Sequence, residues 1–187
     1  MQGEPDLTKW DAWRPEEVTR RLAGVKTPWY IAAGWAIDLF LGGGYREHED
    51  LEIAVPQDRL PEVAGALGGF ELVAINAHQN WVREPETGAW RLDIFGEPCD
   101  GDTWLCRRDD RIRMPYADLI ERTADGIPYG RPEIVLLFKA KRAREKDDAD
   151  LAAVLPRLGP YRRRWLAEAL NLVHPGHRWL TALRATA

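Results

Sequence analysis

The chain is poor in cysteine and has no long apolar run. Its 187 residues include two cysteines, Cys99 and Cys106, which are too few for a disulfide framework and have no partner ligands for a zinc site. We therefore expect two free thiols. No stretch approaches the roughly 18 uninterrupted apolar residues of a membrane span, and no basic segment followed by an apolar run marks a signal peptide. We expect a cytoplasmic protein without a membrane partner.

Positive charge is not in excess either. The sequence has 26 Lys and Arg against 30 Asp and Glu, a net charge of −4. A protein that grips long nucleic acid needs a basic face for the phosphates, so we do not expect such a partner. Short arginine clusters at 107–113 and 162–164 indicate surface or phosphate contacts at most. The length predicts one domain, or a domain with a modest appendage, and we find no repeat.

The segment at 46–55 alternates like a strand but carries acids on one side. Alternate strand positions share a face, so Asp50 and Glu52 lie on one side, and the apolar Leu51 and Ile53 lie on the other. Two carboxylates this close repel each other unless a cation lies between them, and Mg²⁺ with oxygen ligands is the usual solution in phosphate-handling sites. The segment is either a metal-binding strand or a half-exposed edge strand with charged outer positions.

A strand, a turn and a helix are predicted before the acidic segment. Positions 28–33 indicate a strand, Gly34 permits a tight turn, and positions 35–41 indicate a short helix that ends at three glycines. A helix that begins on a small-residue turn offers free backbone N–H groups and the positive end of its dipole. Both features are suited to holding a phosphate.

A third acid lies in a second alternating segment. Positions 90–95 read as a strand between Gly88 and Gly96, and Asp93 is the carboxylate in its middle. Asp93 is the candidate to join the first two acids. Alternatively, it forms a salt bridge to an arginine such as Arg91 or Arg83.

These residues together resemble a known family. The run Gly34-Trp35-Ala36-Ile37-Asp38, followed by Arg46-x-His48-x-Asp50-Leu51-Glu52-Ile53, resembles the nucleotidyltransferases of the DNA polymerase β superfamily. Within that superfamily the chain resembles small antibiotic-modifying enzymes, the aminoglycoside 2''- and lincosamide nucleotidyltransferases. The resemblance implies an α/β (α+β) fold, in which helices flank a small mixed β-sheet core and the C-terminal half is mostly helical.

The resemblance also implies roles for the acids. Asp50, Glu52 and Asp93 are the expected catalytic and metal-binding residues, and two Mg²⁺ ions are the expected cofactors. Asp93 would ligate one ion or accept the proton of an attacking hydroxyl. The substrate implied is a nucleoside triphosphate (NTP), and neither ATP nor GTP is favoured.

A second set of residues is expected to bind the nucleotide. The backbone at Gly34 and Trp35 would hold the phosphates, whereas Arg46 and His48 would either contact phosphate or anchor the loop. In the segment 132–155, a helix with proline in its first turn is followed by a helix capped by Asp147 or Asp148.

The lysines at the end of the first of these helices have two interpretations. The resemblance implies that Lys139 or Lys141 meets the triphosphate. Alternatively, this is a solvated basic face on which Lys146 and Asp150 pair at i, i+4.

The implied activity is transfer of a nucleoside monophosphate from an NTP to a hydroxyl of a small-molecule acceptor. Relatives usually have two glycines, or glycine and serine, where this chain has Ala33-Gly34, and many have aspartate in place of Glu52. These departures motivate a second interpretation, a non-catalytic relative that binds nucleotide or a partner protein. A third interpretation keeps the chemistry and transfers the nucleotide to a protein or an RNA end.

Composition divides the chain near position 98. Region 1–98 is the predicted catalytic core, and region 99–187 is predicted to be mostly helical, with helices near 116–122, 133–144, 147–155, 162–172 and 177–185. Helices at 15–22 and 60–67 and strands at 70–75 and 80–83 complete the prediction for the first half. The sequence His174-Pro-Gly-His177 indicates a turn rather than a metal site. Among nine tryptophans, Trp81, Trp90 and Trp104 are candidates to stack an acceptor or a base.

Overall fold

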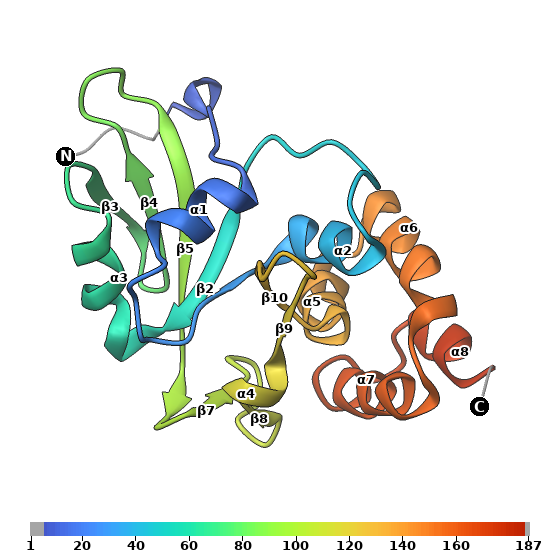
Figure 1. The fold of residues 1–187 in the computed structure, drawn as a ribbon. Helices are drawn as coiled ribbons and strands as arrows, with labels where there is room; N and C mark the ends of the chain where they lie inside the picture. The colour runs from blue at the N-terminus through green and yellow to red at the C-terminus, as the bar shows by residue number, and fades with distance from the viewer. Residues whose placement is uncertain (1–5, 186–187) are drawn as a thin grey trace.

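The computed structural model describes residues 6–185, which form a mixed seven-stranded sheet with helices around it (Figure 1). The order of the main sheet is β3-β4-β5-β2-β1-β10-β9, and β6-β7-β8 form a second, small sheet. The strands are β1 Tyr30–Ile31, β2 Glu52–Pro56, β3 Glu71–Asn76, β4 Gln79–Arg83, β5 Trp90–Glu97, β6 Cys99–Asp100, β7 Thr103–Leu105, β8 Arg113–Pro115, β9 Ile120–Arg122 and β10 Pro128–Gly130.

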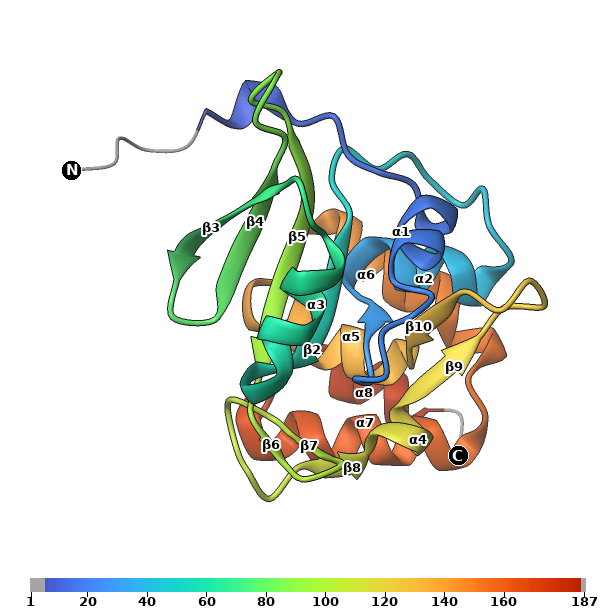
Figure 2. The same cartoon turned by 60° about the vertical axis from the view of Figure 1, so that its left-hand side comes forward.

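Helices surround the sheet on several sides. The α-helices are α1 Pro15–Arg21, α2 Ala33–Leu41, α3 Leu60–Ala66, α4 Tyr116–Leu119, α5 Pro132–Lys139, α6 Glu145–Val154, α7 Pro160–Val173 and α8 Trp179–Arg184. The short 3₁₀ turns are Leu7–Lys9, Gln57–Arg59, Ala140–Arg142 and Leu155–Arg157. In both views α1 and α3 lie over the same side of the sheet (Figures 1 and 2). Helix α5 contacts α2, α6 and α7, and α7 contacts α8.

The two strands that carry the predicted acids lie side by side in the sheet. Strands β2 and β5 run parallel, with Glu52 in register with Asp93 and Ile53 in register with Ile94. Both strands are rich in fully buried apolar side chains, as expected for parallel strands that are covered on both faces. The edge strand β3, by contrast, is mostly exposed. Because β2 and β5 are buried inner strands, Glu52 and Asp93 lie in the interior of the sheet and not at its edge.

The main sheet crosses the predicted boundary near position 98. Strand β10 pairs in parallel with β1, with Tyr129 opposite Ile31, and β9 pairs with β10. One cluster of buried residues includes side chains from both halves, such as Val18 and Leu170. The mixed α/β fold class is confirmed, and the division into 1–98 and 99–187 stays a prediction about folding units.

Several predicted boundaries change in three dimensions. The helix predicted at 116–122 ends at Leu119, because the next residues pair with β10 and form β9. The strand predicted at 28–33 is only Tyr30–Ile31. The acidic strand begins at Glu52, so Asp50 lies just before it. The elements between α1 and β5 otherwise lie close to their predicted positions.

Other predictions concern side chains outside the sheet. Both cysteines are free, as expected. Residues 174–177 form the predicted turn between α7 and α8. Trp81, Trp90 and Trp104 are 8%, 6% and 0% exposed, so these rings belong to the interior and not to a stacking surface. No helix between residues 6 and 185 is long and apolar enough to cross a membrane.

Candidate functional site

A cleft of about 1080 Å³ lies where α2, β2, β5 and the segment from α5 to α6 meet. All the predicted site residues except Asp93 line it. They are Gly34, Trp35, Arg46, His48, Asp50, Glu52, Lys139 and Lys141. The structure thus brings together residues that are far apart in the sequence, from the turn before α2 to the end of α5.

The turn before α2 depends on Ala33 rather than on Gly34. Ala33 has φ +48°, the left-handed region that L side chains rarely adopt, and it is the first residue of the helix. The tight turn that we predicted at Gly34 takes its positive φ from Ala33 instead. A Cβ at Gly34 would lie 2.2 Å from Arg46 Nη2 and 3.0 Å from His48 Cε1, so a larger residue there would displace the end of the Arg46 side chain.

Asp38 organises the loop that follows α2, and sequence analysis assigned it no role. The side chain is 2% exposed and accepts hydrogen bonds from the backbone N–H groups of Gly44, Tyr45 and Arg46 at 3.1, 2.6 and 3.2 Å. The Nε2 atom of His48 lies 3.9 Å from the same carboxylate. The clue was an aspartate on the otherwise apolar helix at 33–41, since a buried carboxylate needs several donors.

Trp35 completes the attachment of this loop. Its ring stacks on His48 with centroids 4.3 Å apart, and its Nε1 donates to the backbone oxygen of Asp50 at 2.9 Å. Burial is the main cause that lowers the pKa of His48, which favours the neutral ring at pH 7. Both residues therefore anchor the loop that delivers Asp50 to the cleft.

The three acids are neighbours with unequal exposure. Asp50 is exposed at the cleft, Glu52 is partly covered, and Asp93 is 4% exposed. Burial, together with Asp50 and Asp93, raises the pKa of Glu52 to about 8. Burial also raises the pKa of Asp93 to about 7, against the opposing effects of the Gln79 and Trp81 side chains. A nearby positive charge would stabilise the ionised form of each carboxyl group.

Asp93 does not form the arginine salt bridge that was the alternative. Arg91 pairs with Asp11 and Glu84, and Arg83 lies 3.6 Å from Glu71. The Oδ1 atom of Asp93 is buried without any hydrogen-bond partner. An unpaired carboxylate oxygen inside a protein is costly, so this atom is available for a cation or a substrate hydroxyl.

The three acids supply ligands suited to a divalent cation, but they do not form a complete metal site. Between residues 6 and 185 no three His, Cys, Asp or Glu side chains converge as a ready metal site. Nevertheless, oxygen ligands of this kind suit Mg²⁺, which usually binds one or two carboxylates plus substrate phosphates. The unpaired oxygen of Asp93 and the raised pKa of Glu52 are the features that fit such an ion.

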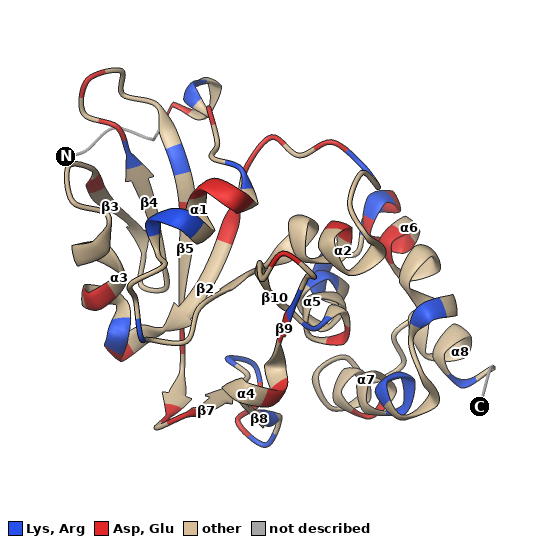
Figure 3. Cartoon of the chain, in the orientation of Figure 1, with Lys and Arg blue, Asp and Glu red and all other residues tan. Residues whose placement is uncertain are grey.

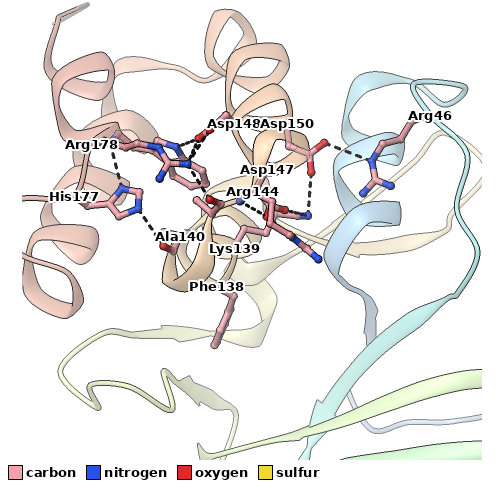
Figure 4. A network of polar contacts seen from close by, with 12 residues as sticks. Arg46, Phe138, Lys139, Ala140, Arg144, Asp147, Asp148, Asp150, His177 and Arg178 are labelled. Carbon is pink, nitrogen blue, oxygen red and sulfur yellow. Dashed lines mark hydrogen bonds and ion pairs between the residues drawn. The ribbon is translucent and has the colours of Figure 1, made fainter. Parts of the chain in front are cut away.

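Lys139 lies between two carboxylates of α6. Its Nζ is 2.9 Å from Asp147 Oδ1 and 3.0 Å from Asp150 Oδ2 (Figure 4). The Nε of Arg46 lies 3.6 Å from the other oxygen of Asp150, which joins the loop after α2 to α6. An ammonium has three donors, so Lys139 can meet a phosphate while it keeps both partners.

Two details of this region correct the prediction. Asp150 pairs with Lys139 and Arg46, not with Lys146. Helix α6 begins after Arg144, and Asp147 accepts from the Arg144 backbone N–H at 3.0 Å from inside the first turn. The cap residue is therefore not an aspartate.

Basic residues gather on one wall of the cleft. They lie between the last residue of α5 and the first turn of α6, a stretch with several basic positions (Figure 3). The members that line the cleft are Lys139, Lys141, Arg142, Arg144 and Lys146. The basic wall also contains Asp147 and the acidic loop also contains Arg46, so charges of both signs meet in a cleft suited to a metal-bound polyphosphate.

A different set of side chains lines the far end of the cleft, and sequence analysis missed it. Tyr30 donates a hydrogen bond to Glu97, and burial raises the pKa of this carboxyl to about 7. The Arg107 guanidinium lies 5.6 Å from the ring centre of Phe95 and 5.5 Å from that of Phe138. The signal was the continued alternation of β5, which the prediction ended at 95.

Comparison with known proteins agrees with these features. A model of the aminoglycoside-2''-adenylyltransferase family matches residues 16–94, which run from α1 into β5 and include the turn, the loop and the three acids. No curated protein matches the chain in sequence.

Solved structures match a larger part of the chain than the family model does. The lincosamide antibiotic adenylyltransferase LnuA, with lincomycin bound, is 20% identical with a TM-score of 0.56, over 75% of this chain and 93% of that one. ANT(2'')-Ia, in complex with adenylyl-2''-tobramycin, is 14% identical with a TM-score of 0.61, over 84% of this chain and 95% of that one. The chain therefore has the nucleotidyltransferase fold, and the resemblance to DNA polymerase β-type nucleotidyltransferases is confirmed.

Proposed function

We propose that this chain, a protein with the nucleotidyltransferase fold, transfers a nucleoside monophosphate from an NTP to a hydroxyl of a small-molecule acceptor. The acceptor oxygen attacks the α-phosphorus, and the bond from that phosphorus to the departing pyrophosphate breaks. The observation that carries the proposal is the shared cleft, where Asp50 and Glu52 lie opposite Lys139 and Lys141.

The residues divide into nucleotide and acceptor ends. The first turn of α2 at Gly34 and the basic wall at Lys139 and Lys141 bind the phosphates. Arg46, which pairs with Asp150, adds a positive charge beside that turn. The acceptor lies toward Phe95 and the far end of the cleft.

Asp50 and Glu52 would hold Mg²⁺, which would supply a positive charge that stabilises the attacking and leaving oxygens. Asp93, whose Oδ2 is held by Gln79, serves as the proton acceptor. The buried Oδ1, which has no protein partner, accepts the proton of the attacking hydroxyl. The acceptor class rests on the likeness to the structures of LnuA with lincomycin and of ANT(2'')-Ia with adenylyl-2''-tobramycin.

The first prediction concerns Asp50. With ATP or GTP and Mg²⁺, and with lincomycin and tobramycin as first acceptors, the wild type should release pyrophosphate and form a nucleotidylated product visible by mass spectrometry. Asp50→Asn should lower turnover by about a hundredfold or more, since ligand orientation alone is worth 10–100-fold. Its melting temperature should stay close to that of the wild type, because Asp50 is exposed.

Asp118→Asn is the matched control, an exposed aspartate on α4 outside the cleft. Full activity of Asp50→Asn would contradict the assignment of the site.

The non-catalytic interpretation keeps one supporting observation, the strained alanine at the phosphate turn. It predicts that calorimetry detects either metal-dependent NTP binding or no NTP binding. It also predicts that no acceptor leads to pyrophosphate release. Labelled nucleotide on protein or RNA in a lysate would instead favour a macromolecular acceptor. Product with a small acceptor excludes the non-catalytic interpretation.

A further inference from the structure

A chain of hydrogen bonds leads from the β3–β4 turn to Asp93. The backbone N–H of His78 donates to Asn76 Oδ1 at 2.9 Å, and Asn76 Nδ2 donates to Gln79 Oε1 at 2.9 Å. Gln79 Nε2 then donates to Asp93 Oδ2 at 2.6 Å. These three hydrogen bonds connect a backbone donor to one oxygen of a buried acid.

The backbone donor settles which way each amide faces. A backbone N–H can only donate, so the Asn76 atom that faces it is the carbonyl oxygen, and the Asn76 nitrogen faces Gln79. Gln79 must then offer its oxygen to Asn76 and its nitrogen to Asp93. Turning either amide over would put two donors or two acceptors together.

Strand register brings Gln79 within reach of the acid. Strands β4 and β5 are antiparallel, with Gln79 opposite Phe95 and Trp81 opposite Asp93. Gln79 is therefore a diagonal neighbour of Asp93 on the same face of the sheet. Asp93 is 4% exposed, and its Oδ1 has no partner. Gln79 holds Oδ2, and Oδ1 makes no hydrogen bond, although Trp81, whose side chain also lowers the pKa of Asp93, lies directly opposite on β4.

We propose that Gln79 is a positioning residue for nucleotidyl transfer, that Asn76 orients it, and that the pair directs the free Oδ1 of Asp93 toward the acceptor hydroxyl. This inference rests on the proposed function. A proton acceptor acts only within hydrogen-bond reach, and a small misplacement costs rate more than it costs binding. Neither amide needs to touch the substrate.

The hydrogen bond itself is tested in metal-free protein, without any activity. Gln79→Leu and Asp93→Ala, alone and together, form a double-mutant cycle of urea unfolding. In the wild-type background Gln79→Leu should lower the unfolding free energy enough to change the equilibrium constant about tenfold to a hundredfold, because hydrogen bonds to charged groups are worth that much. In the Asp93→Ala background the change should be clearly smaller, because only the hydrogen bond from Asn76 is then lost.

The positioning role is tested by kinetics. Gln79→Leu should lower kcat about tenfold to a hundredfold and leave the KM for NTP within about twofold. Asn76→Asp should also lower kcat, although residue 76 does not contact Asp93. A carboxylate at position 76 attracts the Gln79 nitrogen and so turns the Gln79 oxygen toward Asp93. Asn80→Asp is the control, since it adds the same charge on the other face of β4.

The outcomes separate this inference from the proposed function. Coupling in the unfolding cycle, with kcat lowered by both Gln79→Leu and Asn76→Asp but not by Asn80→Asp, supports it. Additive unfolding effects overturn it, because the hydrogen bond is then absent. Strong coupling with unchanged kcat also overturns it and leaves only a structural bond. If the wild type releases no pyrophosphate although the coupling is present, the proposed function fails, and the positioning role fails with it.

Discussion

At the scale of single residues, Ala33 has the most unusual conformation in the cleft. It lines the cleft at φ +48°, where an L side chain costs about 1–2 kcal/mol and glycine costs little. Strain of this size persists only where the surrounding contacts hold the backbone. Here the following residue is covered by Arg46 and His48, so the turn has little freedom to relax.

Ala33→Gly should therefore raise the free energy of unfolding by up to about 1 kcal/mol. The relief of strain exceeds the entropy that glycine adds to the unfolded chain. Urea unfolding measures the change. Ala32→Gly is the matched control, because Ala32 has an ordinary φ of −113° and should lose about 0.4–1 kcal/mol. Equal losses in both variants would show that Ala33 is not strained.

At the scale of elements, the cleft depends on how one loop is tied to α2. Asp38 accepts three backbone N–H groups, Trp35 stacks on His48 and binds the Asp50 backbone, and Arg46 reaches Asp150 on α6. The loop thus connects a helix of the first half to a helix of the second half. Its conformation decides where Asp50 lies.

Asp38→Ala should lower the free energy of unfolding by about 2–3 kcal/mol, because three N–H groups lose a charged acceptor. It should also weaken Mg²⁺-dependent NTP binding, measured by calorimetry, since Asp50 loses its support. Asp38→Asn keeps the volume and one acceptor oxygen, and we expect an intermediate loss. Unaltered NTP affinity in Asp38→Ala would mean that the loop holds its conformation without this carboxylate.

At the scale of the whole molecule, the sheet and the helices of the second half bury three carboxyl groups around one cleft. The pKa values of Glu52, Asp93 and Glu97 are raised to about 8, 7 and 7, in each case chiefly by burial. Groups with raised pKa values stabilise the fold most when they are protonated. Their contribution is complete below their ordinary pKa values near 4 and is lost as pH rises through 7 and 8.

The metal-free protein should therefore lose thermal stability as pH rises from about 5 to about 8. Mg²⁺ binds the ionised carboxylates, so it should raise the melting temperature more at pH 8 than at pH 5. Scanning calorimetry at the two values tests both statements. Asp50→Asn should reduce the Mg²⁺ effect, and an equal effect of Mg²⁺ at both pH values would contradict the proposed ligand set.

Much of the site could be predicted because its signals are local. The alternation around Asp50 and Glu52, the glycine-containing turn and the single acid of the predicted strand 90–95 are all patterns that extend over only a few residues. Asp38 and Gln79 could not be predicted in the same way, because their partners are backbone groups and a side chain on another strand. Glu97 was missed because the end of β5 is set by its pairing with β2.

The sequence by itself determined the order of the elements from α1 to β5 and the acids that face one side of the sheet, because side-chain spacing and turn residues act over a few positions. The mixed fold class followed from the family resemblance, and strands β6 to β10 were not predicted. Only the tertiary structure decided which strands are neighbours, which donors hold Asp38 and Asp93, and how Lys139 is shared by Asp147 and Asp150. Those contacts join residues far apart in the chain, and burial of the common core selects among them. The cleft exists because that core brings both halves of the chain to one sheet.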